Sequence, residues 1–285
     1  MPEPVLTLFS APKPFKGIIG TIQTNAILSW QAIRPEPQVI LIGNEQGVAG
    51  FADKHGIKHI PGVECNSKGV PLIPSIFSIA RREGSASILC YVNADIILPS
   101  NFIQMISQIK SLKFLIAGRR WDLQVDGAID FTNRDWEKEL LADRERHGVL
   151  HGHSAMDYFV FPKSVNVEFP QFPVGRPGWD NWFLYAIGKQ NIPIIDGTDA
   201  LTVIHQNHPP AYSPGGSDAQ YNSTLGGGNS DRRTLLSTDW YLSMNGLIRP
   251  PFNRRLLGMI LSLRSFQLFL GFKREIQLYI NKCTQ

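Results

Sequence analysis

Hydrophobic positions along the first 120 residues follow two different periods. Short continuous apolar runs, typical of strands buried on both faces, alternate with segments whose apolar side chains recur at helical spacing. The predicted strands are 5–9, 38–42, 58–60, 87–92 and 114–117. The predicted helices are 18–33, 46–55, 71–83 and 99–112. This alternation predicts an α/β fold, with a mostly parallel central sheet covered by helices on both faces.

The pattern then becomes less regular. A charged helix is expected at 135–147, an aromatic strand at 157–162, and an amphipathic helix at 179–190 before a strand at 192–196. Residues 209–231 are rich in Gly, Pro, Ser and Asn, which predicts a long flexible loop. We therefore expect three parts: a main α/β domain, a flexible loop or lid with a linker, and a basic amphipathic helical extension, at 1–208, 209–250 and 251–285.

Composition narrows the class of protein. The chain has 285 residues, of which 43% are hydrophobic, so it is not a disordered chain. Its three cysteines, Cys65, Cys90 and Cys283, are widely spaced and suggest neither a disulfide framework nor a zinc site. No secretory leader and no apolar run long enough to span a membrane is evident. These features favour a reducing, cytoplasmic location.

The positive charge is concentrated at one end of the chain. The whole chain carries +4, but residues 251–285 carry +5, which leaves −1 for the first 250 residues. The body therefore offers no broad nucleic-acid-binding face. The basic, apolar tail suits peripheral contact with the inner face of a membrane. It equally suits packing on the α/β domain or on another copy in a homo-oligomer, and both alternatives stay open.

The first candidate site follows the strand at 87–92. Asn93 and Asp95 are two residues apart, so on an extended backbone their side chains point the same way. In open parallel sheets, ligands bind beyond the carboxyl ends of the strands. An amide oxygen and a carboxylate there suit a hard divalent cation that also holds a diphosphate. The alternative is a strand-end turn in which Asp95 caps the next helix.

The second candidate site is a Gly/Pro-rich loop that enters the helix at 179–190. Asp180 lies in the first helical turn, where a carboxylate can deprotonate a hydroxyl or simply cap the helix. Aromatic rings flank it and an arginine precedes it, which predicts a sugar-binding pocket. Its expected members are Arg176, Trp179, Asn181 and Trp182.

Histidines form the third candidate site. His205 and His208 follow a strand-like segment just before the flexible loop, and either one is a candidate ligand for a metal or a phosphate. The alternative is a surface turn. A further run, His147, His151 and His153, has metal-site spacing but is not expected to bind metal.

Loops after three predicted strands offer further polar groups. Ser10, Ala11, Pro12 and the adjoining Lys13 are placed to meet a nucleotide, and Asn44 follows the second strand, where a base or ribose is often held. After the strand at 114–117, two arginines suit phosphate and an aspartate suits a sugar hydroxyl. These residues are Arg119, Arg120 and Asp122. The alternative in each case is loop structure or a surface ion pair.

Several motifs are absent from the sequence. It contains no P-loop, no G-x-G-x-x-G after the first strand and no G-x-S-x-G nucleophile elbow. It also lacks the Gly-rich, Arg-containing N-terminal signature of sugar nucleotidyltransferases. These absences argue against nucleoside-triphosphate hydrolysis, dinucleotide chemistry, α/β-hydrolase chemistry and nucleotidyl transfer.

Taken together, the motifs FSAPKPF, YVNADIIL, AGRRWD, DYFVFP, GRPGWDNW and VIHQNH occur in an order that resembles a GT-A glycosyltransferase of the family-2-like type. The resemblance covers about residues 5–208 and includes a group of uncharacterised bacterial and plant proteins. It implies a GT-A-like, Rossmann-like catalytic domain. It also implies transfer of a sugar from a nucleotide-diphosphate sugar to a glycan or lipid-linked acceptor, as in polysaccharide biosynthesis.

The same resemblance implies roles for single residues. Asn93 and Asp95 occupy the Asp-x-Asp position that holds Mn²⁺ or Mg²⁺ against the donor diphosphate, with Asn93 replacing the first Asp. Asp180 occupies the position of the general base of inverting members, and His205 or His208 that of a metal- or phosphate-binding histidine. Residues 209–231 correspond to a loop that closes over the donor. Because Asn93 departs from the motif, a catalytically silent nucleotide- or glycan-binding scaffold is the alternative function.

Overall fold

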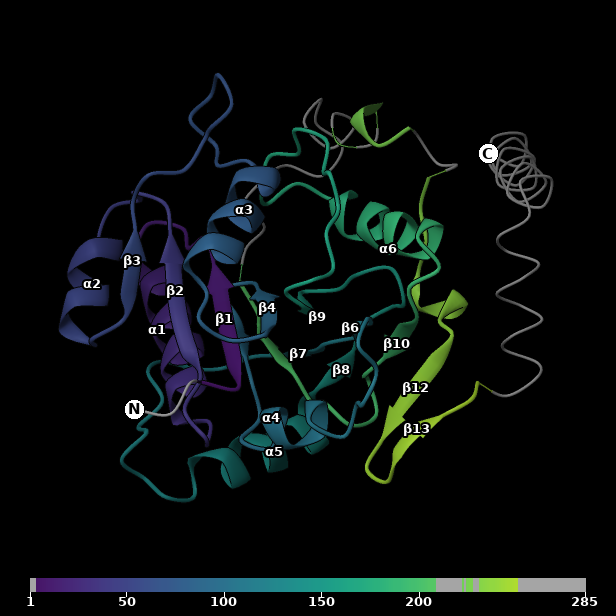
Figure 1. The fold of residues 1–285 in the computed structure, drawn as a ribbon. Helices are drawn as coiled ribbons and strands as arrows, with labels where there is room; N and C mark the ends of the chain where they lie inside the picture. Colours follow the sequence, from purple (N-terminus) through teal and green to yellow (C-terminus); the bar gives the residue numbers. More distant parts are fainter. Residues whose placement is uncertain (1–3, 209–221, 223, 228–230, 251–285) are drawn as a thin grey trace, which may run out of the picture.

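The computed structural model describes residues 4–208, 222, 224–227 and 231–250. The expected lid lies almost entirely outside these residues, and the basic C-terminal extension lies wholly outside them. Figure 1 shows the described part as a twisted central sheet with helices on either side. None of its helices has both the length and the hydrophobicity that a membrane span needs.

The central sheet has nine strands in the order β13-β12-β10-β6-β9-β4-β1-β2-β3. Only β9 and β13 run antiparallel to their neighbours. The strands, in chain order, are β1 (Leu6–Ser10), β2 (Gln38–Ile42), β3 (Lys58–Ile60), β4 (Ile88–Val92), β6 (Leu115–Ala117), β9 (Tyr158–Pro162), β10 (Ile194–Asp196), β12 (Trp240–Ser243) and β13 (Gly246–Ile248). The predicted mostly parallel sheet is confirmed.

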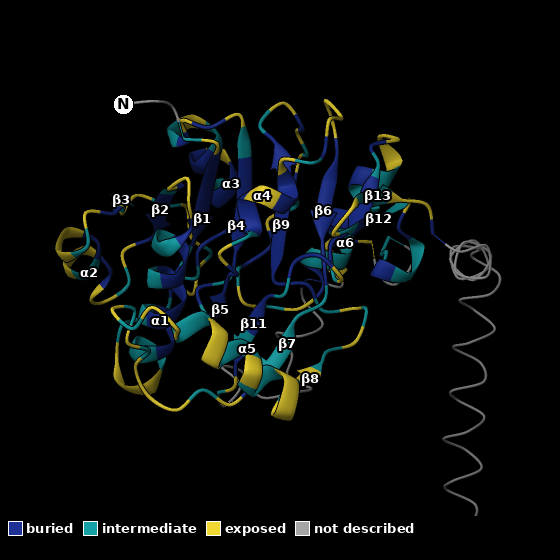
Figure 2. Ribbon diagram, turned by 90° about the horizontal axis from the view of Figure 1, so that it is seen from below, coloured by how far each residue is buried: buried dark blue, intermediate teal, exposed yellow. Residues whose placement is uncertain are grey.

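Side chains alternate between two apolar layers, one on each face of this sheet. Leu8 of β1 and Leu41 of β2 pack in the first layer, and their neighbours Phe9 and Ile40 pack in the second. The helices α1 (Gly17–Ala32), α2 (Val48–Lys54) and α4 (Phe102–Ile106) contribute to the first layer. The helices α3 (Ile73–Glu83) and α6 (Trp179–Lys189) contribute to the second. Figure 2 shows the strands as the buried centre of the molecule. The predicted coverage of both faces is therefore confirmed.

A second, smaller sheet has the order β5-β11-β7-β8. Its strands are β5 (Ile96–Ile97), β7 (Trp121–Leu123), β8 (Val149–Leu150) and β11 (Ile204–Gln206), and the exposed helix α5 (Trp136–His147) lies beside it. The sequence pattern did not predict this sheet, because its short strands are held by pairing between segments that lie far apart in the sequence. The small sheet brings segments 95–97, 121–123 and 204–206 together.

Two segments differ from their prediction. The helix expected at 99–112 is only α4, since the chain leaves it after Ile106 and residues 110–113 lie exposed. In the region expected to be lid and linker, the structure has a 3₁₀ turn, η2 (Leu235–Ser237), and the hairpin β12–β13. Trp240 and Tyr241 of that hairpin pair with β10, which extends the central sheet.

Candidate functional site

A cavity of about 400 Å³ opens beyond the carboxyl ends of β1 and β4. In a parallel sheet this edge gathers the loops that follow different strands, so residues distant in sequence meet there. Part of its wall is apolar, formed by the start of α1 and by the loops around Pro12, Val70 and Val174. The polar residues of the wall come from several separate segments and are Lys13, Gln23, Glu45, Lys68, Asn93, Asp95, Arg176 and His208.

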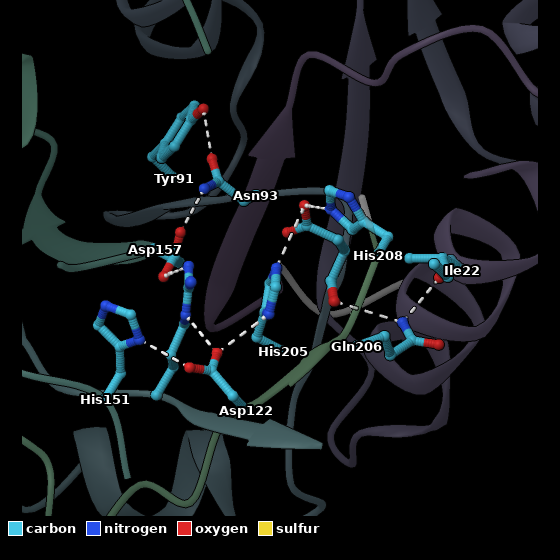
Figure 3. A network of polar contacts seen from close by, with 11 residues as sticks. Ile22, Tyr91, Asn93, Asp122, His151, Asp157, His205, Gln206 and His208 are labelled. Carbon is cyan, nitrogen blue, oxygen red and sulfur yellow. Dashed lines mark hydrogen bonds and ion pairs between the residues drawn. The ribbon is translucent and has the colours of Figure 1, made fainter. Parts of the chain in front are cut away.

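Three potential metal ligands converge at this cavity. Asp95 lies in the turn between β4 and β5, His205 lies on β11, and His208 follows β11. Nε2 of His208 lies 3.2 Å from Asp95 Oδ2, and Nε2 of His205 lies 3.9 Å from the same oxygen. One ligand atom from each side chain falls within 4.8 Å of the others. We call Asp95, His205 and His208 the open cluster (Figure 3).

One oxygen of the open cluster lacks a hydrogen bond. Asp95 Oδ1 is buried and has no hydrogen-bond partner in the described part of the chain. A buried carboxylate oxygen without a donor is unfavourable, and a bound cation would satisfy it. Burial alone would raise the pKa of Asp95, but the His208 contact and the charges of His205 and Lys13 hold it below its ordinary value. This carboxylate is therefore ionised at neutral pH, and the residues present fit a divalent metal.

A second group of polar side chains adjoins the open cluster and is bonded within itself. Asn93 Oδ1 accepts a hydrogen bond from Tyr91 at 2.8 Å, and Asn93 Nδ2 donates to Asp157 Oδ1 at 2.6 Å. Arg120 donates from Nη1 to Asp157 Oδ2 at 2.7 Å and from Nε to Asp122 Oδ1 at 2.8 Å. His151 Nδ1 lies 2.6 Å from Asp122 Oδ2. We call these six residues the closed network.

Opposite charges stabilise the closed network. Desolvation would lower the pKa of the Arg120 guanidinium, but Asp157 and Asp122 raise it above its usual value. Burial would raise the pKa of Asp122, but His151 and Arg120 lower it. The network touches the open cluster at one point, where His205 Nδ1 lies 3.1 Å from Asp122 Oδ1, an ion-pair distance without hydrogen-bond alignment.

Asp180 is the acid with a strongly raised pKa near the cavity. It lies in the first turn of α6, and its Oδ1 accepts a hydrogen bond from the Gly178 amide at 3.1 Å. Burial, with a smaller contribution from the charge of Asp157, raises the pKa of Asp180 to about 6. Asp180 follows Arg176, a lining residue, by four positions, but is not itself among the residues that line the cavity.

The structure brings together some of the residues predicted from sequence and separates others. Ala11, Pro12, Asn93, Asp95, Arg176 and His208 line the cavity. Ser10 is buried beside it, and Asn44 is exposed next to the lining residue Glu45. Arg119 donates to the carbonyls of Leu150 and His151, so its guanidinium is engaged with the backbone. Arg120 and Asp122 belong to the closed network.

Among the described residues, the aromatic side chains expected around Asp180 do not lie at the cavity. Trp179 is only 6% exposed and packs against Tyr91 and Phe159 in the second apolar layer, because it lies on the inner side of α6. Trp182 packs against Phe169 in a tilted arrangement and against Phe172 edge to face. Neither ring lines the cavity, and Asn181 donates to the carbonyls of Ser154 and Arg233.

The geometry makes three residues prominent, of which the sequence indicated only Lys13, as part of the stretch placed to meet a nucleotide. Lys13 lines the cavity and acts on the charge of Asp95. Asp157 precedes β9, and its position beside Asn93 follows from the antiparallel pairing of β9 with β4, which the sequence pattern does not reveal. Gln206 stands between the two histidines and is fully buried. An isolated glutamine between two candidate ligands is the one signal that was available for it.

No known family model matches the chain, and no curated protein matches it. Solved structures that it is similar to include TarS 1–349 of S. aureus, with 9% identity over 70% of this chain and 60% of that chain and a TM-score of 0.48. Another is a mannosyltransferase from Pyrobaculum calidifontis in complex with GDP-Man and Mn²⁺, with 14% identity, coverage of 75% and 59%, and a TM-score of 0.43.

A third is glucosyl-3-phosphoglycerate synthase from Mycobacterium tuberculosis in complex with Mg²⁺ and UDP, with 14% identity over 73% of each chain and a TM-score of 0.41. The chain spans 60% or less of the length of the S. aureus structure and of the mannosyltransferase.

Proposed function

We propose that this protein is a nucleotide-sugar-dependent glycosyltransferase assisted by a divalent metal. The observation that carries the proposal is the open cluster: one carboxylate and two imidazoles converge on the carboxyl edge of a mostly parallel sheet, beside a cavity of about 400 Å³. A cavity of this size suits a nucleotide or sugar. The buried, unpaired Asp95 Oδ1 supports a cation as the missing partner.

The ligand set favours one metal over another. Asp95, His205 and His208 would hold the ion, and two imidazoles among three ligands favour Mn²⁺ over Mg²⁺, which prefers oxygen ligands and water. When bound, a divalent ion neutralises charge that develops on a leaving diphosphate. Lys13, which lines the same cavity, adds a positive charge beside Asp95 for the same anionic group.

The candidate base is Asp180. An acid acts well as a general base when its pKa lies near the working pH, and burial brings the pKa of Asp180 to about 6. In its ionised form Asp180 accepts the proton of an acceptor hydroxyl. The acceptor oxygen then attacks the anomeric carbon as the bond to the diphosphate breaks, which gives inversion when the attack comes from the opposite face. The acceptor is a glycan or a lipid-linked glycan.

A panel of nucleotide sugars tests this proposal. Each donor is incubated with the full-length protein in Mn²⁺, in Mg²⁺ or in EDTA, and release of nucleoside diphosphate is measured. We expect release with at least one donor, faster in Mn²⁺ than in Mg²⁺ and lost in EDTA and in Asp95→Asn. Binding of a nucleotide sugar without release or transfer would instead support the catalytically silent scaffold.

A further inference from the structure

Helix α1 has polar side chains on its buried face. Gln23, Asn25 and Ser29 are each at most 2% exposed, although they lie on a helix that packs inside the first apolar layer. Buried amides and hydroxyls are costly unless they are hydrogen-bonded, so such residues need partners. Each of the three bonds a different segment: Gln23 pairs with the backbone of Lys13, Asn25 donates to Gln206 and to the Gly127 carbonyl, and Ser29 accepts from the Leu98 amide.

Gln206 connects this helix to the open cluster. Its side chain is fully buried, and its Oε1 accepts a hydrogen bond from Asn25 Nδ2 at 2.9 Å. Its Nε2 donates to the Ile22 carbonyl at 2.8 Å and to the Asp95 carbonyl at 3.3 Å. The Gln206 backbone amide also donates to the Asp95 carbonyl at 3.3 Å. One residue thus joins the cavity wall at Ile22 to the backbone of a candidate metal ligand.

The position of Gln206 on its strand explains how it can do this. Side chains alternate along an extended strand, so Gln206 points away from the side taken by its neighbour His205. His205 faces Asp95 and Asp122, while Gln206 faces α1. Strand β11 therefore carries the candidate ligand His205 and, one residue later, Gln206, whose side chain fixes the backbone of the candidate ligand Asp95.

We propose that Gln206 is a positioning residue for the metal site, an inference that rests on the proposed function. It does not touch the ion. It holds the Asp95 backbone at a fixed distance from β11 and α1, so that the Asp95 carboxylate meets both histidines. Residues that orient metal ligands from outside typically change metal affinity by about 10-fold to 100-fold when they are lost.

The test substitutes Gln206 with a side chain of similar length that cannot donate. In Gln206→Met the carbonyls of Ile22 and Asp95 lose their side-chain donor, whereas the volume is nearly kept. The probe is Mn²⁺ itself, titrated with and without UDP into the full-length protein and followed by the loss of the free Mn²⁺ electron paramagnetic resonance signal. We expect the Mn²⁺ affinity of Gln206→Met to fall about tenfold.

A matched control separates positioning from general loss of stability. Thr7 is as buried as Gln206 and makes two side-chain hydrogen bonds, to Gln38 and from the Ala86 amide, at the amino end of β1 and away from the cavity. Thr7→Val should lower the melting temperature but keep wild-type Mn²⁺ affinity. If Gln206→Met does not fold, Gln206→Asn, whose shorter amide cannot reach Ile22, takes its place and should weaken Mn²⁺ binding by a smaller factor.

Each result decides the matter. Wild-type Mn²⁺ affinity in the folded Gln206 variant overturns the positioning role but leaves the metal site standing. An equal loss of affinity in Thr7→Val also overturns it, since the effect would then follow stability alone. Absence of Mn²⁺ binding by the wild-type protein, with and without UDP, refutes the metal site and the role of Gln206 with it.

Discussion

The open cluster and the closed network lie side by side yet differ in how their polar atoms are satisfied. In the closed network Arg120 neutralises two carboxylates, and both polar atoms of the Asn93 amide are bonded within the protein. In the open cluster Asp95 Oδ1 is buried with no hydrogen-bond partner among the described residues, although members of both groups border the cavity. Both groups are rich in Asp and His, so residue type alone does not separate them. The unpaired carboxylate oxygen of Asp95 is therefore the feature that distinguishes the open cluster from the closed network.

This contrast changes the meaning of Asn93. In the sequence, Asn93 stands where the resemblance expects the first Asp of a metal-binding motif, which predicts weaker metal binding. In the structure its amide is both a donor to Asp157 and an acceptor from Tyr91, a combination that a carboxylate cannot supply. Asn93 thus forms part of the hydrogen bonding of the closed network, and the candidate metal ligands are Asp95 and the two histidines.

The largest expected effect comes from removing the charge of the open cluster. Asp95→Asn keeps the shape of the side chain but removes a ligand that carries a negative charge. We expect diphosphate release to fall by about 1,000-fold, equivalent to about 4 kcal/mol of transition-state stabilisation. Asp143→Asn is the matched control, because Asp143 contacts His147 at 2.7 Å on the exposed helix α5. If Asp95→Asn releases nucleoside diphosphate at the wild-type rate, the open cluster does not hold a metal needed for the reaction.

Breaking the closed network should affect stability more than metal binding. Arg120→Met leaves Asp122 and Asp157 facing each other without their shared cation, and their side chains are only 20% and 9% exposed. Loss of one partner of a buried ion pair leaves an uncompensated charge, so the free energy of unfolding should fall by about 3 kcal/mol. Urea unfolding measures it.

The control for Arg120 is Arg82→Met. Arg82 is 63% exposed where it pairs with Glu83, and surface pairs contribute about 1 kcal/mol or less. A similar loss of stability in both variants would mean that the closed network is no more than a surface ion pair.

A smaller effect on stability is expected when Asn93 is replaced by Asp, which restores the Asp-x-Asp motif. Asn93→Asp places a carboxylate where an amide now donates to Asp157 at 2.6 Å, so a hydrogen bond becomes a repulsion. We expect the free energy of unfolding at pH 7 to fall by about 1–2 kcal/mol. Asn166→Asp introduces the same charge at an exposed position and should change little. Higher stability in Asn93→Asp would show that the hydrogen bond from Asn93 to Asp157 does not stabilise the closed network.

The smallest predicted effect is a pH dependence that belongs to Asp180. Because burial raises its pKa to about 6, the ionised form that accepts a proton is lost as the pH falls through 6. The ratio of the wild-type rate to the Asp180→Asn rate should therefore drop about tenfold from pH 7 to pH 5. Taking this ratio cancels any loss of metal at low pH. A ratio that stays constant with pH would remove Asp180 as the base.

Much of the main sheet and its helices could be predicted from the sequence. Strands β2 and β3 lie at the predicted residues, and helices α1, α3 and α5 each begin and end within two residues of their predicted bounds. Long apolar runs and helical spacing are local signals, so they can be read from one chain. The small sheet could not be predicted, because β5, β7, β8 and β11 are held by pairing between segments up to 111 positions apart.

The candidate site divides in the same way. The members of the open cluster could be predicted from the sequence, because Asp95 follows a clearly predicted strand and the two histidines lie at the end of a strand-like segment. The partners of Asn93 and Arg120 could not, because the contacts to Asp157 depend on β9 inserting antiparallel between β4 and β6. The sequence places Trp179 in a sugar pocket, because an aromatic residue beside an acid has the same sequence pattern on either face of a helix. In the structure Trp179 is buried, so it lies on the face of α6 that packs against the core.

Calorimetric titration of nucleoside diphosphates tests the central claim most directly. UDP and GDP are titrated into the wild-type protein and into Asp95→Asn, each in Mn²⁺ and in EDTA. The open cluster predicts that at least one diphosphate binds the wild-type protein at least tenfold more tightly in Mn²⁺ than in EDTA, and that Asp95→Asn loses this difference. Equal affinities in Mn²⁺ and EDTA, or a metal effect that survives in Asp95→Asn, would contradict a metal–diphosphate site at the open cluster.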